Sequence, residues 1–398
     1  MSETLAQLID DSLFERIVAF RRDLHQHPEL SWRETRTAQK VCAVLDDLGI
    51  SYRSGVAKTG IVADIGAKPG IPSVALRADM DALPIVEETE LPFRSQVDGV
   101  MHACGHDGHT SMLLGAAMLL AGDENLPAPV RLIFQPAEET GRGASAMIAD
   151  GALEGAALVF GGHVDRHFPL GTIMVTEGAV NASSDKFVIT VAGRGGHAAR
   201  PHETIDAVVV GSLLVMSIQT IVSREVNPAH PSVVTVGRFE AGTAANVIAG
   251  QARLEGSIRA QDAEVRKSLQ QSIRRIAAAI GQLHGATVDV EICEGTPPVI
   301  NPPEGAAIAR RAAAATVGDD NIVKLKTANM GGEDFSYYLE QVGGCYVRFG
   351  TTVPGRDAFP AHSSRFDFDE RALAVGARYY YELAKAAGET IAAQPNGR

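Results

Sequence analysis

Length, composition and charge limit what this chain can be. Its 398 residues are enough for two domains, and 45% hydrophobic with 21% charged residues is the composition of an ordinary globular protein. The formal net charge of −12 lacks the basic footprint of nucleic-acid binding, and no window approaches the roughly eighteen uninterrupted apolar residues of a membrane span. We therefore expect neither nucleic-acid nor membrane partners.

The N-terminus and the cysteines predict the compartment. The first twenty residues carry acidic side chains and lack the apolar core of a secretory signal. The four cysteines are scattered along the chain and do not have the spacing of a disulfide framework. We therefore expect a cytoplasmic protein.

The first 180 residues alternate between helical and strand patterns. Apolar residues at helical spacing predict helices at 13–24, 35–48, 110–120 and 143–153. Short apolar runs bounded by turn residues predict strands at 60–66, 73–79, 130–136 and 157–164. This alternation is typical of an α/β fold with a mostly parallel sheet flanked by helices.

From Lys186 the pattern changes to the order β-α-β-β-α-β. These elements are expected at 186–193, 204–224, 232–242, 250–260, 263–285 and 287–293. The Pro-rich segment Glu294–Gly305 then returns the chain to the first domain. We predict a small α+β domain at 185–294, inserted into a discontinuous domain made of 1–184 and 295–398.

The segment Met101–Thr110, MHACGHDGHT, contains three histidines, a cysteine and an aspartate. Cys104 and His106 lie two residues apart, between glycines and just before an apolar helix. Thiolate and imidazole are both good zinc ligands, and loops of this kind hold the sites of open α/β sheets. A single Cys-x-His pair is more often structural than metal-binding, so this cluster alone only suggests a metal.

Two adjacent glutamates, Glu138 and Glu139, follow an apolar strand in FQPAEET. A metal-dependent hydrolase needs one carboxylate as a ligand and a second, unligated one to accept a proton from water. Adjacent residues can divide these roles because their side chains point in different directions. The alternative is a solvated surface pair.

Other candidate side chains lie in comparable places. His163 in GGHV and His362 in PAHSS follow apolar runs or lie in turns, and Asp81 follows a predicted strand, where it could orient a ligand histidine. His197 is presented among small residues in GRGGHAARP. Each residue alone has a structural explanation, as a core, capping or turn residue. Their recurrence at strand ends and loops favours one metal centre.

Seven segments together resemble a known family. They occur in order between Leu24 and Glu370 and read LHQHPELSWRET, LRADMDALPIVEE, MHACGHDGHT, FQPAEE, GRGGHAARPHETIDA, MGGEDFSYYL and HSSRFDFDE. In this combination the chain resembles the dinuclear metal amidohydrolases that include hippurate hydrolase, bacterial aminoacylases and plant auxin-conjugate hydrolases. The resemblance implies a zinc-exopeptidase-like catalytic domain and an inserted domain that serves as lid and forms a homodimer.

The resemblance also implies roles for individual residues. Two divalent ions are expected, with zinc first and manganese, cobalt or nickel as alternatives, held by Cys104, His106, Glu139, His163 and His362. Glu138 matches the general base, and Asp81 the acid that orients the metal centre. His197 matches a histidine that reaches the partner subunit's active site. Asn246 and Arg259 match positions that hold the carboxylate of the substrate.

The expected reaction is hydrolysis of an N-acyl amino acid to a carboxylate and a free amino acid. The attacking group would be a hydroxide between the two metals, with Glu138 as its base. A dipeptidase or carboxypeptidase, or a hydrolytic deaminase of an aromatic amine, could use the same centre. A non-catalytic metal-binding protein is the alternative of another class, but such a protein has no use for Glu138 beside Glu139.

Overall fold

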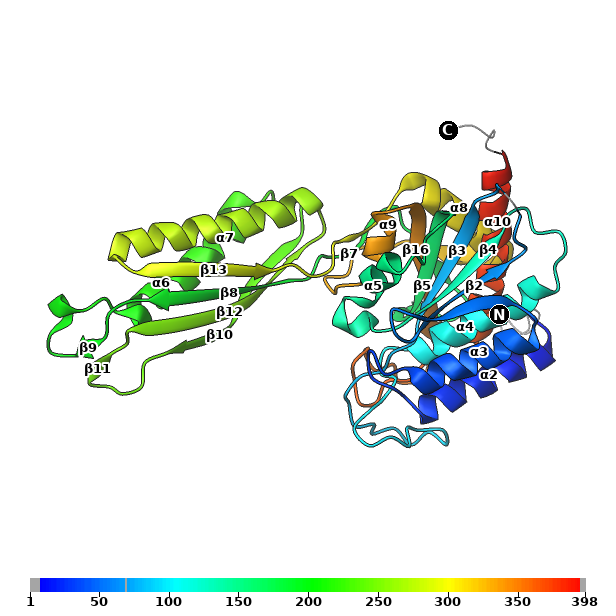
Figure 1. Ribbon diagram of the computed structural model, residues 1–398, viewed down its shortest axis with the longest axis horizontal. Coiled ribbons are helices and arrows are strands. Elements are labelled where there is room, and N and C mark those ends of the chain that lie inside the picture. The colour runs from blue at the N-terminus through cyan, green and yellow to red at the C-terminus, as the bar shows by residue number, and fades with distance from the viewer. Residues whose placement is uncertain (1–7, 69, 394–398) are drawn as a thin grey trace. The chain divides into compact units, whose positions relative to one another are not determined.

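A computed structural model describes residues 8–68 and 70–393, so residues 1–7 of the acidic N-terminal segment lie outside it. The chain divides into two compact units (Figure 1). The first is made of the residues up to Gly178, Ile300–Thr327 and the residues from Asp334, and the second of Ala179–Val299 and Ala328–Glu333. The second unit is longer than the predicted 185–294, and it includes Ala328–Glu333 because the backbone of Asn329 hydrogen-bonds to Val180 and Ala182.

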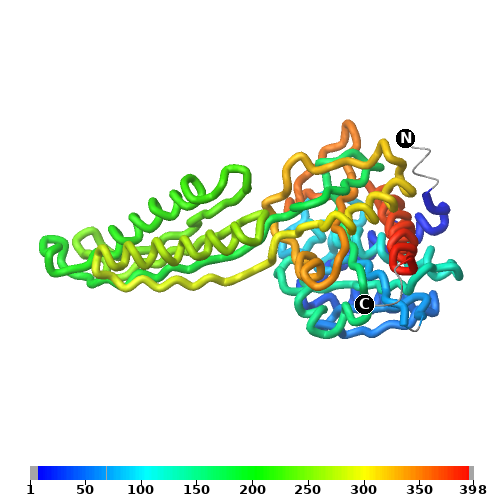
Figure 2. Tube along the Cα trace, turned by 90° about the horizontal axis from the view of Figure 1, so that it is seen from above, coloured from blue at the N-terminus to red at the C-terminus, as the bar shows by residue number. Residues whose placement is uncertain are grey.

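The first unit is built on an eight-stranded sheet with the order β1-β2-β4-β3-β5-β16-β6-β15. The four central strands are parallel to one another, and antiparallel pairs occur toward the edges. The strands are β1 (Ser51–Val56), β2 (Gly60–Ile65), β3 (Ser73–Asp79), β4 (Val130–Gln135), β5 (Ala156–Pro169), β6 (Ile173–Met174), β15 (Ile322–Val323) and β16 (Gly343–Thr352). In Figure 2 the early (blue to green) and late (orange to red) parts of the chain lie together in this unit.

The central strands explain where polar side chains collect. Every residue of β3 is buried, as expected for a parallel strand covered on both faces. The strand β5 pairs with β3 only as far as Gly161 opposite Arg77, and then continues to Pro169. His163 therefore lies inside β5, as the predicted strand 157–164 implies, but beyond the stretch paired with β3, and the strand runs five residues further than predicted.

Helices flank this sheet. They are α2 (Asp11–Gln26), α3 (Thr35–Asp47), α4 (His106–Ala121), α5 (Gly143–Ala149), α8 (Pro303–Val317), α9 (Ser336–Leu339) and α10 (Ala372–Ala393). The helix α10 packs against α4 and α8, and α2 packs against α4. The helix α4 begins at His106, earlier than the predicted 110, because Gly105 with φ 90° turns the chain into its first turn. The first helical residue is thus a candidate metal ligand.

The second unit contains a four-stranded antiparallel sheet with the order β10-β12-β8-β13. Its elements follow the predicted β-α-β-β-α-β order: β8 (Asp185–Ala192), α6 (Ala207–Thr220), β10 (Ser232–Ala241), β12 (Gln251–Ala260), α7 (Ala263–His284) and β13 (Thr287–Cys293). Alternate residues of β8 are buried, and the two helices share one apolar core with the sheet. Short strands β9 (Gly196–His197) and β11 (Val247–Ile248) form a separate pair.

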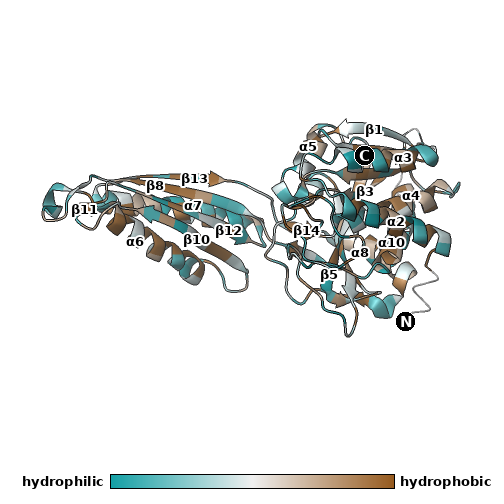
Figure 3. Ribbon diagram, turned by 90° about the horizontal axis from the view of Figure 1, so that it is seen from below, coloured by the Kyte–Doolittle hydropathy of each residue, from teal (hydrophilic) through white to brown (hydrophobic). Residues whose placement is uncertain are grey.

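By its length and composition, the segment that contains helix α6 could be taken for a membrane span, although none was expected from the sequence. With the following π turn, Ala207–Glu225 is long and apolar enough to cross a membrane by length and composition, with a mean hydropathy of 1.7. Part of its apolar surface is explained by the fold, because Val210, Leu214 and Ile218 are buried in the core of the unit. Figure 3 shows the hydrophobic character of α6, and its residues Val208, Val209, Leu213 and Met216 remain exposed.

Candidate metal centre

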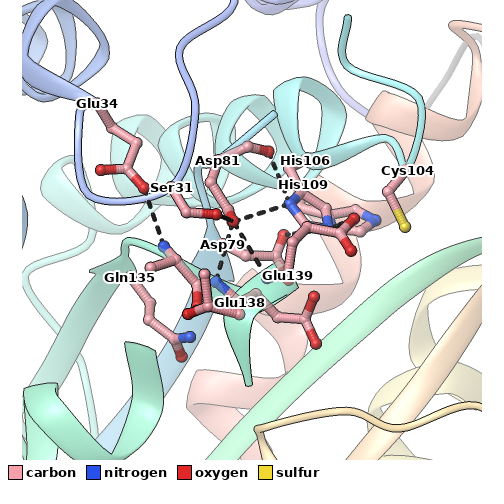
Figure 4. A network of polar contacts seen from close by, with 12 residues as sticks. Ser31, Glu34, Asp79, Asp81, Cys104, His106, His109, Gln135, Glu138 and Glu139 are labelled. Carbon is pink, nitrogen blue, oxygen red and sulfur yellow. Dashed lines mark hydrogen bonds and ion pairs between the residues drawn. The ribbon is translucent and has the colours of Figure 1, made fainter. Parts of the chain in front are cut away.

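Asp81 organises one side of the candidate site (Figure 4). Its buried carboxylate accepts hydrogen bonds from the Ser31 hydroxyl at 2.7 Å and from the backbone N–H groups of Glu138 and Glu139 at 3.0 and 3.1 Å. Burial alone raises the pKa of Asp81, but the hydrogen bond and charge of His106, with the bond from Ser31, lower it overall. Asp81 is therefore ionised and fixes the turn that carries both glutamates.

His106 presents one ring nitrogen that makes no hydrogen bond. Its Nδ1 lies 2.9 Å from the backbone oxygen of Asp81, which can only accept, so Nδ1 carries a proton. Its Nε2 is buried and makes no hydrogen bond. Burial lowers the pKa of His106, but the charge of Asp79 and the bond to Asp81 raise it well above its usual value. A cation at Nε2 would displace the proton there and bind the nitrogen that makes no hydrogen bond.

The side chains of His163 and Cys104 lie close to each other and to the ring of His106. The Nδ1 of His163 donates to the Val164 carbonyl at 2.6 Å, which leaves Nε2 as an acceptor, 3.3 Å from the Cys104 sulfur. Burial, with the charge of Glu139, raises the pKa of Cys104 to about 12. The sulfur is thus a thiol that gives up its proton when a metal binds.

Glu139 and His362 complete the donor set. Glu139 Oε1 is buried and lies 3.3 Å from His362 Nε2, within ion-pair distance but without the alignment of a hydrogen bond. His362 is held at φ 67°, and its backbone N–H donates to the Ala103 carbonyl at 2.7 Å. One donor atom each from Cys104, Glu139 and His362 lie within 4.8 Å of one another, and the same is true of Cys104, His106 and His163. All five predicted ligands therefore meet in one place, with a donor chemistry that suits zinc.

Glu138 lies beside these ligands on the same turn. The three-residue helix Glu138–Thr140 follows Ala137, which adopts the left-handed conformation. The backbone N–H of Asp334 approaches Glu138 Oε1 at 3.4 Å. One donor atom each from Glu138, Glu139 and His106 also lie within 4.8 Å of one another, so Glu138 can reach a water bound among the ligands.

A buried chain of polar groups behind the ligands was not predicted. His109 Nδ1 lies 2.6 Å from Asp79, and His109 Nε2 accepts from the Val164 N–H at 3.0 Å. Arg77 in turn binds Asp79 at 2.7 Å and Asp334 at 2.8 Å. Both ring nitrogens of His109 are thus engaged, so it supports the ligands instead of being one. The signal available in the sequence was the third histidine of MHACGHDGHT, one helical turn after His106.

The other three predicted site residues, His197, Asn246 and Arg259, lie in the second unit. His197 is exposed on β9 opposite Val247 of β11, and the Asn246 carbonyl accepts from the Ala198 N–H at 3.2 Å. His197 and Asn246 are therefore neighbours. Arg259 lies opposite Val233, at the far end of β12 from β11, so the unit does not bring it together with the other two.

Comparison with known proteins places the chain in a family. The model of the peptidase family M20/M25/M40 matches residues 75–386. The chain belongs to this family. It is accordingly a metal-dependent hydrolase of amide bonds.

Similar proteins cover nearly the whole chain. An N-acetylcysteine deacetylase of Bacillus subtilis is 40% identical over 96% of this chain and 100% of its own. Thermostable carboxypeptidase 1 of Saccharolobus solfataricus is 40% identical over 92% and 94%, respectively. The solved structure of Bacillus subtilis YXEP, described as a dinuclear metal-binding peptidase of the M20 family, has a TM-score of 0.84 at 37% identity, over 96% of this chain and 100% of that one.

Proposed function

We propose that this protein hydrolyses N-acyl amino acids to a carboxylate and a free amino acid, using two divalent ions, of which zinc is the first candidate. One observation carries the proposal: ring nitrogens of His106 and His163 and the Cys104 sulfur converge beside a pair of glutamates. Glu139 has a position among these ligands, while Glu138 adjoins them. This division supplies both a metal centre and a separate base.

The roles of the side chains follow from this arrangement. When bound, the two ions would polarise the amide carbonyl and lower the pKa of the attacking water. Glu138 accepts the proton of that water and returns it to the leaving amine. Asp81 keeps Glu138 and Glu139 in place through their backbone N–H groups and orients the His106 ring.

The substrate class is proposed from the relatives. The N-acetylcysteine deacetylase supports an N-acyl amino acid, and the carboxypeptidase supports a peptide as the second candidate. We expect the purified protein to release amine from a panel of N-acetyl, N-benzoyl and indole-3-acetyl amino acids more readily than from dipeptides. Chelation should abolish the activity, and zinc or manganese should restore it. Turnover that survives removal of the metal would contradict the proposal.

We also propose a cytoplasmic homodimer formed through the second unit. The exposed apolar residues of α6, and β10 as an edge strand, give this unit a surface that a second copy can cover. In such a dimer His197 would act in the partner's active site. The cytoplasmic location is proposed from the sequence, because the four cysteines do not have the spacing of a disulfide framework.

Mixing two inactive variants tests His197 in trans. His197→Ala and Glu138→Ala subunits should be inactive alone, while their heterodimer has one site with both residues intact. Random exchange of equal amounts should recover about a quarter of wild-type activity. Mass spectrometry must show that heterodimers form, and no recovery in their presence would reject a role in trans.

A further inference from the structure

Glu34 is buried next to the turn that carries the candidate base (Figure 4). We propose that Glu34 is a positioning residue for Glu138, holding the backbone of Ala137 in the conformation from which the Glu138 turn starts. The inference rests on the proposed function, because it assigns to Glu34 an effect on catalysis that passes through Glu138. The segment that contains Glu34, LHQHPELSWRET, received no role from the sequence.

Two of the three hydrogen bonds of Glu34 hold backbone N–H groups. Its Oε1 accepts from the Ala137 N–H at 2.9 Å and from the Trp32 N–H at 3.0 Å, and its Oε2 accepts from the Thr59 hydroxyl at 2.6 Å. The carboxylate is thereby shared between its own loop, the turn before Glu138, and the chain just ahead of β2. Because Glu34 is completely buried, water does not replace these bonds.

Ala137 is the residue that needs this restraint. Its φ of 55° and ψ of 39° are left-handed, a conformation that side-chain-bearing residues rarely adopt unless their surroundings impose it. Its N–H is held by Glu34, and its carbonyl accepts from the Gly143 N–H at 3.2 Å and the Thr140 hydroxyl at 2.9 Å. Without the bond to Glu34 the N–H would be left buried and unpaired, and the direction in which the chain enters Glu138 would no longer be fixed.

The same loop holds the turn at a second point. Ser31 donates to Asp81, and Asp81 accepts from the N–H groups of Glu138 and Glu139. Three successive backbone N–H groups, from Ala137 to Glu139, are therefore held by two buried carboxylates. Asp81 reaches the two glutamates themselves, whereas Glu34 reaches the residue before them.

A matched pair of substitutions separates the effect of side-chain length at position 34 from the effect of its charge. Glu34→Gln loses the charge but keeps an oxygen for the backbone N–H groups and an amide that can donate to Thr59, so kcat should stay within about threefold of wild type. Glu34→Asp keeps the charge but is one methylene too short, and should lower kcat by about 10–100-fold with KM changed much less. Thr59→Val removes only the third bond and serves as the control with unchanged kcat.

Hydrogen exchange of the metal-free protein gives a readout independent of activity. In the peptide covering 135–142, exchange should be about tenfold faster in Glu34→Asp and unchanged in Glu34→Gln. Equal kcat in the two variants of an active enzyme would overturn the inference. If the wild type hydrolyses none of the substrates, the proposed function fails. The exchange comparison then decides alone: faster exchange only in Glu34→Asp supports Glu34 as the residue that holds the turn, and equal exchange overturns it.

Discussion

Replacing Glu138 by glutamine should lower kcat by about 10²–10⁴-fold while bound metal stays at the wild-type level. The amide cannot accept the proton of the attacking water, but it has nearly the same size and keeps an oxygen for the Asp334 N–H. Because the proposed role of Glu138 lies in the chemical step, KM should change far less than kcat. Steady-state kinetics and metal analysis by mass spectrometry on the same preparation measure both effects.

The neighbouring glutamate provides the control. Glu139 Oε1 is buried between His106 and His362, so Glu139→Gln should reduce the metal content as well as the activity. Added zinc or manganese should then restore part of the activity of Glu139→Gln and none of that of Glu138→Gln. If both variants lost metal equally, the separation of base and ligand between these two residues would be wrong.

Replacing Arg21 by methionine should destabilise the first unit by about 3–5 kcal/mol, because it leaves a buried carboxylate without its main partner. Arg21 is completely buried in α2 and binds Asp107 at 2.8 Å, Asp367 at 3.1 Å and Glu370 at 3.3 Å. Asp107 directly follows His106, so the same contact anchors the start of α4. Denaturant unfolding followed by fluorescence at pH 7 gives the loss of stability.

The adjacent arginine is a matched control on the same helix. Arg22 also binds Glu370, but 46% of its side chain is exposed, so Arg22→Met should cost less than about 1 kcal/mol. Similar losses in both variants would show that helix propensity, and not the buried ion pair, sets the effect.

The loss of folding stability caused by Arg21→Met should also depend on pH. Burial raises the pKa of Asp107, but the charges of Arg21 and His25 outweigh it and hold that pKa well below 3.8. Such a carboxyl contributes stability that is complete above its unfolded pKa and is lost as the pH falls through its folded pKa. Without Arg21 the buried carboxyl takes up a proton more readily, so the penalty should be smaller at about pH 5 than at pH 7.

Much of the fold and of the site could be predicted from local patterns. The alternation of helices and strands, the change of pattern near Lys186 and the β-α-β-β-α-β order depend on hydrophobic periodicity, which short segments carry by themselves. The five candidate ligands and Glu138 are recognisable because few residue types bind metal or accept protons, and their motifs occur in order along the chain.

The supporting contacts required the tertiary structure. Arg77 and Asp334, Glu34 and Ala137, and Arg21 and Glu370 are far apart in the sequence, so neither member of a pair signals the other. A buried arginine or glutamate also contradicts the usual preference of charged residues for the surface, and only its partners explain it.

The sequence by itself determined which candidate ligands and which candidate base this protein carries, and which predicted strands and helices they adjoin. The tertiary structure decided that β5 continues past His163 to Pro169, that His109 supports the candidate ligands, and that Arg259 lies away from His197. The physical reason is that metal-binding chemistry depends on residue type, whereas orientation depends on hydrogen bonds between segments that come together only when the sheet and helices pack.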